Sequence, residues 1–79
     1  MAYVVAGRRD CTFCKKAQAA LAAARLTYTF VDMQQPDGAA LYRTSYAPCV
    51  PAYHTTVPCV FFGHCFIGGH ADLVRHLDG

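Results

Sequence analysis

Cys11 and Cys14 are the residues of this sequence whose type and spacing point most directly to chemistry. They bound the run Cys11-Thr12-Phe13-Cys14, where a short apolar segment gives way to a helical pattern, so both sulfurs lie at one helix end. A thiolate there is stabilised by free backbone N–H groups and by the positive end of the helix dipole, which lowers its pKa. We therefore expect thiol–disulfide exchange, in which Cys11 attacks as a thiolate and Cys14 closes a disulfide with it.

The residues around this pair favour redox chemistry over metal binding. Four residues add positive charge around the pair, and the negative charge of Asp10 partly offsets it; the four are Arg8, Arg9, Lys15 and Lys16. A C-x-x-C pair is also half of many zinc sites, and these need two more Cys or His ligands at compatible spacing. No second tight pair is formed by the four histidines or by the other cysteines, Cys49, Cys59 and Cys65. We therefore expect no metal site, and a strand–helix–strand setting strengthens the redox interpretation.

Length and composition describe one small domain without an evident nucleic-acid or membrane partner. The chain has 79 residues, is 54% hydrophobic and carries a net charge of +2, with only Asp among its acidic residues. Nucleic-acid-binding domains usually show a strong basic patch, and a membrane span needs about 20 apolar residues. Met1 to Ala6 lacks the pattern of a signal peptide, and the five cysteines are an odd number. We expect a reducing, cytoplasmic location.

The first half of the chain has the pattern of a βαβ unit. Residues 3–6 read as a buried strand, residues 12 to about 25 as a helix, and residues 28–32 as a second strand. Short links between them predict parallel strands. The helix has an apolar stripe, which consists of Phe13, Ala17, Ala20, Leu21 and Ala24.

The second half predicts a helix, a hairpin and a closing helix. Pro36-Asp37-Gly38 reads as a loop, residues 39–46 as a helix, and residues 47–55 as irregular. Residues 59–62 and 65–67 form an expected hairpin around Gly63-His64, and residues 70–77 an expected helix. We therefore predict a single α/β domain over residues 1–79, with a four-stranded mixed sheet flanked by about three helices. This order is typical of the thioredoxin-like fold.

Two further motifs could bind a ligand. In Thr56-Val57-Pro58, a cis bond before Pro58 would turn the Val57 backbone outward, where it could pair with an extended peptide. Taken alone, Pro58 fits an ordinary strand-start proline better. In Gly68-Gly69-His70-Ala71-Asp72, the glycines allow close approach, and the following helix N-terminus can hold a carboxylate. Asp72 could accept a hydrogen bond from a ligand ammonium group, or its negative charge could simply stabilise the start of the helix through the helix dipole.

Together these motifs resemble the glutaredoxin family over nearly the whole chain. The resemblance rests on Gly7-Arg8-x-x-Cys11-x-Phe13-Cys14, Phe30-Val31-Asp32, Thr56-Val57-Pro58 and Phe66-Ile67-Gly68-Gly69-x-x-Asp72. It implies that Cys11 is the nucleophile and Cys14 the resolving cysteine. Glutathione would be the co-substrate, with no metal or organic cofactor. The partners would be disulfide-containing or glutathionylated proteins, and the chain would be a monomer.

The resemblance also implies where glutathione would lie. Its glycine carboxylate would approach Arg8, and its cysteine backbone would pair with Val57, next to Thr56 and a cis Pro58. Its γ-glutamyl end would be held at Gly69, Ala71 and Asp72, with His70 adjacent. Phe13 takes the usual aromatic position of the family between the two cysteines.

Several positions depart from the family pattern. Thr12 replaces a frequent proline, Asp10 stands where a glycine is common, and residues 47–55 are longer and richer in proline, so Arg43 is only a candidate contact. Cys49, Cys59 and Cys65 are expected to pack as small hydrophobes. His54, His64 and His76 are expected at the surface or in turns.

Two other functions remain open at this point. One is a redoxin reduced by thioredoxin reductase, although such proteins lack the Gly-Gly-x-x-Asp site in this form. The other is a dimer that binds a [2Fe–2S] cluster through Cys11 thiolates and glutathione thiols, since such clusters take thiolate ligands.

Overall fold

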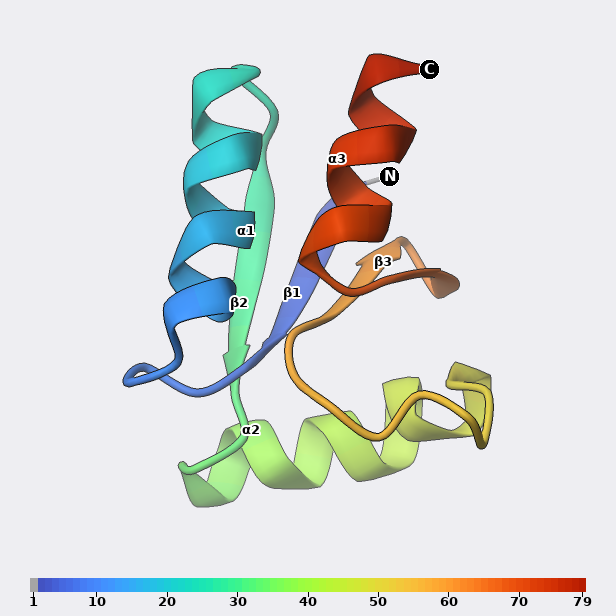
Figure 1. Ribbon diagram of the computed structural model, residues 1–79. Helices are drawn as coiled ribbons and strands as arrows, with labels where there is room; N and C mark the ends of the chain where they lie inside the picture. The colour runs from blue at the N-terminus through green and yellow to red at the C-terminus, as the bar shows by residue number, and fades with distance from the viewer. Residues whose placement is uncertain (1) are drawn as a thin grey trace.

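The computed structural model describes residues 2–79, and it contains one four-stranded mixed sheet (Figure 1). The strands are β1 (Tyr3–Gly7), β2 (Tyr28–Asp32), β3 (Cys59–Phe62) and β4 (Cys65–Gly68), in the spatial order β2-β1-β3-β4. β1 runs parallel to β2 and antiparallel to β3, and β3 runs antiparallel to β4. The predicted four-stranded mixed sheet is confirmed.

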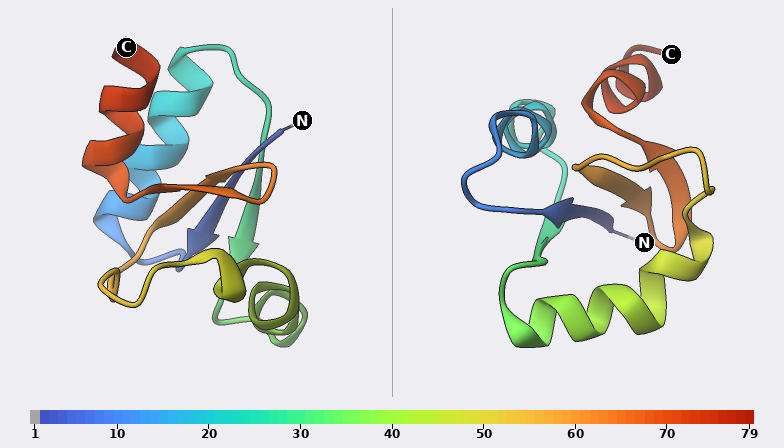
Figure 2. Two further views of the ribbon diagram at one scale, coloured as in Figure 1. Left: turned by 90° about the vertical axis from the view of Figure 1, so that its right-hand side faces the viewer. Right: turned by 60° about the horizontal axis from the view of Figure 1, so that its bottom comes forward.

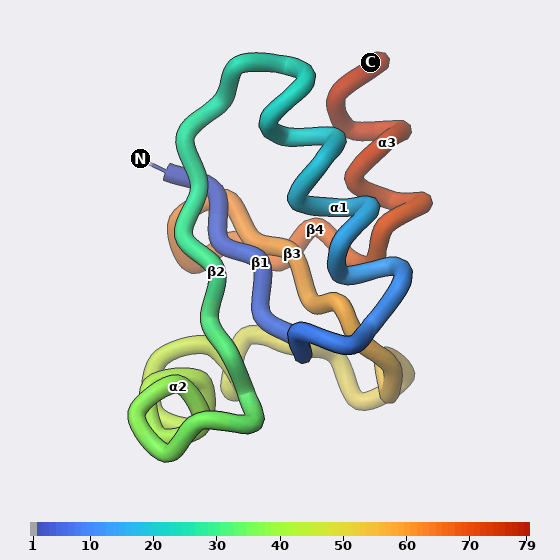
Figure 3. Tube along the Cα trace, turned by 90° about the vertical axis from the view of Figure 1, so that its left-hand side faces the viewer, coloured from blue at the N-terminus to red at the C-terminus, as the bar shows by residue number. Residues whose placement is uncertain are grey.

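Two helices lie side by side on one face of the sheet, α1 (Thr12–Ala23) and α3 (His70–Asp78) (Figure 3). Between them and the sheet lies a buried apolar cluster of Val5, Ala17, Leu21, Val60 and Leu73. α1 ends two residues earlier than predicted, because Arg25 adopts the left-handed conformation with φ of 59° and cannot continue the helix.

The other face of the sheet is covered by α2 (Pro36–Leu41) and its continuation (Figure 2). The continuation is a π-helical turn over Tyr42–Tyr46 and a short 3-10 turn over Ala47–Cys49. Tyr42 and Tyr46 pack on the second core cluster, which consists of Val4, Ala6, Val31, Cys59 and Phe61. The loop predicted at residues 36–38 is wrong, because Pro36 begins the helix, where its missing N–H breaks no hydrogen bond.

Phe13 does not belong to the buried stripe that helical periodicity predicted. It is 54% exposed, whereas Ala17 and Leu21 are fully buried. Phe13 lies in the first turn of α1, with the Lys16 ammonium 5.1 Å from its ring centroid and the His70 ring centroid 5.8 Å away. Ala24, at the other end of the stripe, is exposed as well.

The three cysteines outside the C-x-x-C pair differ in burial. Cys59 is buried in the second core cluster, as expected. The same expectation is wrong for Cys49 and Cys65, which are exposed because one lies in the short turn after Tyr46 and the other at the start of β4. Across residues 2–79, none of the helices combines the length and apolarity needed to cross a bilayer.

Candidate active site

Cys11 is the N-cap residue of α1, so its sulfur lies among the backbone amides at the start of the helix. The Cys14 N–H donates to the Cys11 sulfur at 3.3 Å. On its other side, the Cys11 thiol contacts the Val57 carbonyl oxygen at 4.0 Å, which is long for a hydrogen bond. The thiol is partly exposed, and it can therefore meet a substrate.

The surroundings of Cys11 favour the thiolate. Partial burial raises the pKa of this thiol, but hydrogen bonds from the Cys14 side chain and from the Cys14 and Phe13 amides act in the opposite direction. The charge of Arg8 adds to them, and the net result is a pKa below the ordinary value. The direction agrees with the sequence prediction. Arg9 instead forms an ion pair with Asp32 at 3.1 Å.

Cys14 has the opposite character, although it lies only one helical turn away. It is fully buried, and burial, the hydrogen bond with Cys11 and the Cys11 charge together raise its pKa to about 11. Gly7 makes room for it, since a side chain at residue 7 would collide with the Cys14 sulfur. The pair thus consists of a partly exposed sulfur with a lowered pKa and a buried sulfur with a raised pKa.

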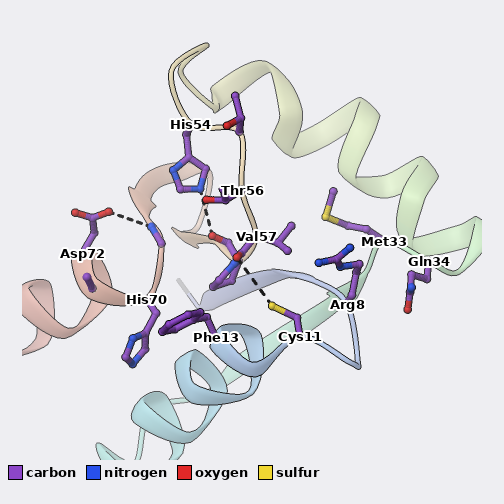
Figure 4. Close-up of a pocket in the computed structure, with 14 residues that line it drawn as sticks. Arg8, Cys11, Phe13, Met33, Gln34, His54, Thr56, Val57, His70 and Asp72 are labelled. Atoms are coloured by element: carbon purple, nitrogen blue, oxygen red, sulfur yellow. Dashed lines mark hydrogen bonds between the residues drawn. The ribbon is translucent and has the colours of Figure 1, made fainter.

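An open cleft of about 930 Å³ lies in front of Cys11. It is lined by all the predicted site residues except Cys14, which lies beneath it; they are Arg8, Cys11, Phe13, Thr56, Val57, Pro58, Gly69, His70, Ala71 and Asp72. Arg8 lies at one end, Asp72 and His70 at the other, and Cys11 faces Val57 between them (Figure 4). Arg43 does not line the cleft and lies exposed on the π-helical turn.

One wall of the cleft is the loop Thr56-Val57-Pro58. The Val57–Pro58 peptide bond is cis, as the family resemblance implies and contrary to the simpler interpretation of Pro58 alone. Pro58 is buried, whereas Thr56 is exposed. The Val57 carbonyl is the backbone group that faces the Cys11 sulfur.

The other wall is the turn from β4 into α3. Gly68 has φ of 138°, a conformation that side chains disfavour, and a Cβ there would also collide with the Asp72 carboxylate. Asp72 accepts from the Gly69 N–H at 3.1 Å and forms an ion pair with Arg75. Asp72 therefore stabilises the start of the helix, as its simpler interpretation predicts, while it also lines the cleft.

Four residues that line the cleft are absent from the sequence prediction: Met33, Gln34, His54 and Thr55. Met33 and Gln34 directly follow β2, which pairs with β1. This place in the chain is the only sequence signal that could have indicated that they line the cleft. His54 closes a turn, as predicted, because its N–H donates to the Pro51 carbonyl oxygen at 3.0 Å. Its side chain is half-buried, and Nε2 lies 3.3 Å from the Pro58 carbonyl oxygen. Nowhere in residues 2–79 do three or more His, Cys, Asp or Glu side chains gather as metal ligands.

Comparisons with known proteins identify the family. The glutaredoxin family model matches residues 3–67. Glutaredoxin C1 of Populus tremula x tremuloides in its holo form superposes with a TM-score of 0.71 at 26% identity, over 96% of this chain and 67% of that chain. A buckwheat glutaredoxin–glutathione complex superposes with a TM-score of 0.70 at 28% identity, over 98% of this chain and 69% of that chain.

A relative of nearly the same length is also similar. Reduced Escherichia coli glutaredoxin gives a TM-score of 0.67 at 27% identity, over 99% of this chain and 94% of that chain. No curated protein sequence matches the chain. Because the family model covers most of the sequence, the chain belongs to the glutaredoxin family of thiol–disulfide oxidoreductases.

Proposed function

We propose that this protein reduces disulfides and glutathione mixed disulfides at the expense of glutathione. The observation that carries the proposal is the order of groups along the cleft, with a cation at one end, the reactive Cys11 thiol in the middle and an acid at the other end. Glutathione has a matching order of a glycine carboxylate, a thiol and an α-amino group. The buckwheat relative forms a complex with glutathione, which supports the proposal.

In the proposed complex, Arg8 attracts the glycine carboxylate and the Val57 backbone pairs with the cysteine of glutathione. Thr56, Pro58 and Phe13 flank that pairing. At the other end, Gly69, His70 and Ala71 surround the γ-glutamyl group, and Asp72 accepts from its ammonium. The Asp72–Arg75 pair does not prevent this, because the Arg75 side chain is 76% exposed and such pairs are weak.

The reaction begins when the Cys11 thiolate attacks the glutathione sulfur of a mixed disulfide. A Cys11–glutathione disulfide forms, the original S–S bond breaks, and the substrate leaves as a thiolate that takes up a proton. A second glutathione thiolate then attacks the glutathione sulfur held on Cys11. Oxidised glutathione is released and the Cys11 thiolate returns, so the cycle needs one copy of the chain and no metal or organic cofactor.

Protein disulfides would also need Cys14. Cys11 first attacks one sulfur of the protein disulfide, so that this S–S bond breaks, the other protein sulfur leaves as a thiolate and a mixed disulfide forms. Cys14 loses its proton and attacks the Cys11 sulfur, which releases the reduced protein and leaves a Cys11–Cys14 disulfide. Two glutathiones then reduce that disulfide and leave as oxidised glutathione. The raised pKa of Cys14 depends in part on the negative charge of Cys11. Since that charge is lost in the mixed disulfide, Cys14 becomes easier to ionise at the step that uses it.

Asp72 substitutions test the proposed glutathione site. Asp72→Asn removes the charge but keeps an oxygen that can accept from the Gly69 N–H, so the cap is retained. A hydrogen bond to a charged group contributes roughly 1.5–3 kcal/mol, so KM for glutathione should rise about tenfold or more. Steady-state reduction of a small mixed disulfide over a glutathione series measures this change.

The matched variants are Asp72→Ala and Arg75→Ala. Asp72→Ala should show the same rise in KM together with a loss of about 1 kcal/mol of stability, because it also removes the cap. Arg75→Ala should leave KM at or below the parent value. The proposal fails if Asp72→Asn keeps the parent KM, or if thioredoxin reductase, and not glutathione, reduces the oxidised protein efficiently.

A further inference from the structure

We propose that His54 is a positioning residue that fixes the separation of the two walls of the cleft. The inference rests on the proposed function, because it assigns His54 a part in glutathione recognition without contact with the reacting sulfurs. The sequence gives His54 no role in the site, yet it lines the cleft and lies beside the Thr56-Val57-Pro58 wall (Figure 4).

The first contact of His54 is with the loop that would pair with glutathione. Its Nε2 lies 3.3 Å from the Pro58 carbonyl oxygen. A carbonyl oxygen only accepts, so Nε2 carries the proton and donates in this bond. The bond ties the imidazole to the residue that follows Val57, whose backbone faces Cys11.

The second contact of His54 is with β4, the strand that leads into the opposite wall. The His54 ring packs edge-on to Phe66 of β4, with ring centroids 5.0 Å apart and an interplanar angle of 71°. A side-chain carbon added to Gly69 would lie 3.5 Å from Cε1 of His54 and 3.7 Å from the Pro58 oxygen. The imidazole therefore lies beside both the Pro58 oxygen and Gly69, and its contacts with Pro58 and Phe66 link the Pro58 loop to β4.

From this position, His54 should affect the binding of glutathione but not the reactivity of the Cys11 thiol. The groups that lower the pKa of Cys11 come from Cys14, Phe13 and Arg8, and His54 is not among them. Loss of His54 should let the Val57 loop and the Gly69 turn move relative to each other, so that glutathione cannot pair with both at once. The expected defect is a higher KM for glutathione with an unchanged reactivity of Cys11.

The test compares four variants of the full chain. His54→Ala removes both the donor and the ring, His54→Gln keeps an N–H donor, and His54→Phe keeps the ring. His64→Ala is the control, because His64 is exposed, stacks on Tyr46 and does not line the cleft. For His54→Ala we expect KM for glutathione to rise about three- to tenfold, the range expected for one backbone hydrogen bond.

The other readouts separate positioning from general damage to the fold. In His54→Ala, kcat at saturating glutathione and the rate of Cys11 alkylation by iodoacetamide should stay within about twofold of the parent. His54→Gln should recover most of the KM, and His64→Ala should match the parent. Hydrogen exchange without ligand should be faster at the Gly69 N–H of His54→Ala, which supplies a measurement independent of glutathione.

Three results would overturn the inference. The first is a parent-like KM in His54→Ala with unchanged Gly69 exchange. The second is an equal loss of KM, kcat and alkylation rate that His54→Gln does not relieve, since that pattern indicates a purely structural residue. The third is a parent chain whose rate does not depend on glutathione, which refutes the proposed function and the inference with it.

Discussion

Cys11 and Cys59 contact neighbouring carbonyl groups of one loop, from opposite sides. The Cys11 thiol meets the Val57 oxygen at 4.0 Å at the cleft, and the Cys59 thiol donates to the Thr56 oxygen at 3.6 Å in the core. The two cysteines thus share a local partner of the same kind. Their pKa values nevertheless move in opposite directions.

The difference arises from the remaining surroundings of each sulfur. Burial raises the pKa of Cys59, and a hydrogen bond with the Tyr42 hydroxyl at 3.6 Å only partly opposes it. Burial and the same thiol raise the pKa of Tyr42 to about 12. Cys11 is less buried and receives amide hydrogen bonds at the start of α1. The number of N–H donors to each sulfur and its degree of burial therefore explain why the pKa is lowered at Cys11 and raised at Cys59.

The largest expected effect distinguishes these two cysteines directly. Cys11→Ser should reduce thiol–disulfide exchange to background, because a serine hydroxyl does not replace a thiolate nucleophile. Cys59→Ser is the matched control and should keep nearly the parent kcat, since its sulfur faces the core and not the cleft. Reduction of a small glutathione mixed disulfide measures both. Parent-like activity in Cys11→Ser, or a comparable loss in Cys59→Ser, would contradict the comparison.

A smaller and substrate-selective effect is expected for Cys14, which is buried like Cys59 but lies beside Cys11. Cys14→Ser should slow the reduction of a protein disulfide such as that of insulin, which needs a resolving thiol. It should spare the reduction of a glutathione mixed disulfide, which needs only Cys11. Equal losses on both substrates would mean that Cys14 serves the fold or the Cys11 thiolate and does not resolve the mixed disulfide.

The smallest effect concerns the pH at which Cys11 reacts at half its maximal rate with iodoacetamide. The exposed Cys49 and Cys65 would also react, so both are first replaced by serine in every sample. The Cys11 rate should reach half its maximum below the free-thiol value of about 8.5, and Cys59 should stay unreactive around that pH. A Cys11 midpoint at or above the free-thiol value would contradict the assignment.

The same directions predict opposite effects of pH on folding stability. Cys11 has a lower pKa in the folded chain than in the unfolded chain. Its ionisation therefore adds fully to the free energy of unfolding above the unfolded-state pKa, and this contribution is lost as the pH falls through the folded-state pKa. Cys14 and Cys59 have raised values, so the folded state loses stability as pH rises above their unfolded pKa.

The sheet and the sequence motifs that form the site could be predicted, because each has a strong local signal in the sequence. Short apolar runs, turn residues and the C-x-x-C spacing are properties of neighbouring residues, and the bounds of the four strands match the predicted runs within about a residue. The start of α2 could not be predicted in this way, because Pro36-Asp37-Gly38 fits both a turn and the first turn of a helix. Packing of Gly38 against the Asp32 carbonyl, which leaves no room for a Cβ, is a contact that the sequence does not reveal.

The missing parts of the site depend on contacts between distant segments. His54 lies in the cleft because Pro58, Phe66 and Gly69 surround it, and its sequence neighbours give no sign of this. Phe13 differs, because the family resemblance already places it in the site, and only its assignment to the apolar stripe of the helix is wrong: it lies in the first turn of α1 and is exposed at the cleft. Asp72 could be given two roles from sequence, and only the three-dimensional contacts show that it caps the helix and lines the cleft at once.

The room left by Gly7 also limits how this protein could be re-engineered. Position 7 cannot accept a larger residue without displacing the Cys14 sulfur, so it offers no freedom for adjusting the reduction potential. Thr12 differs, because it is exposed at the first position of α1, where even proline is compatible with the helix. Libraries intended to vary the redox properties of this scaffold should therefore diversify residue 12 and keep residue 7 fixed.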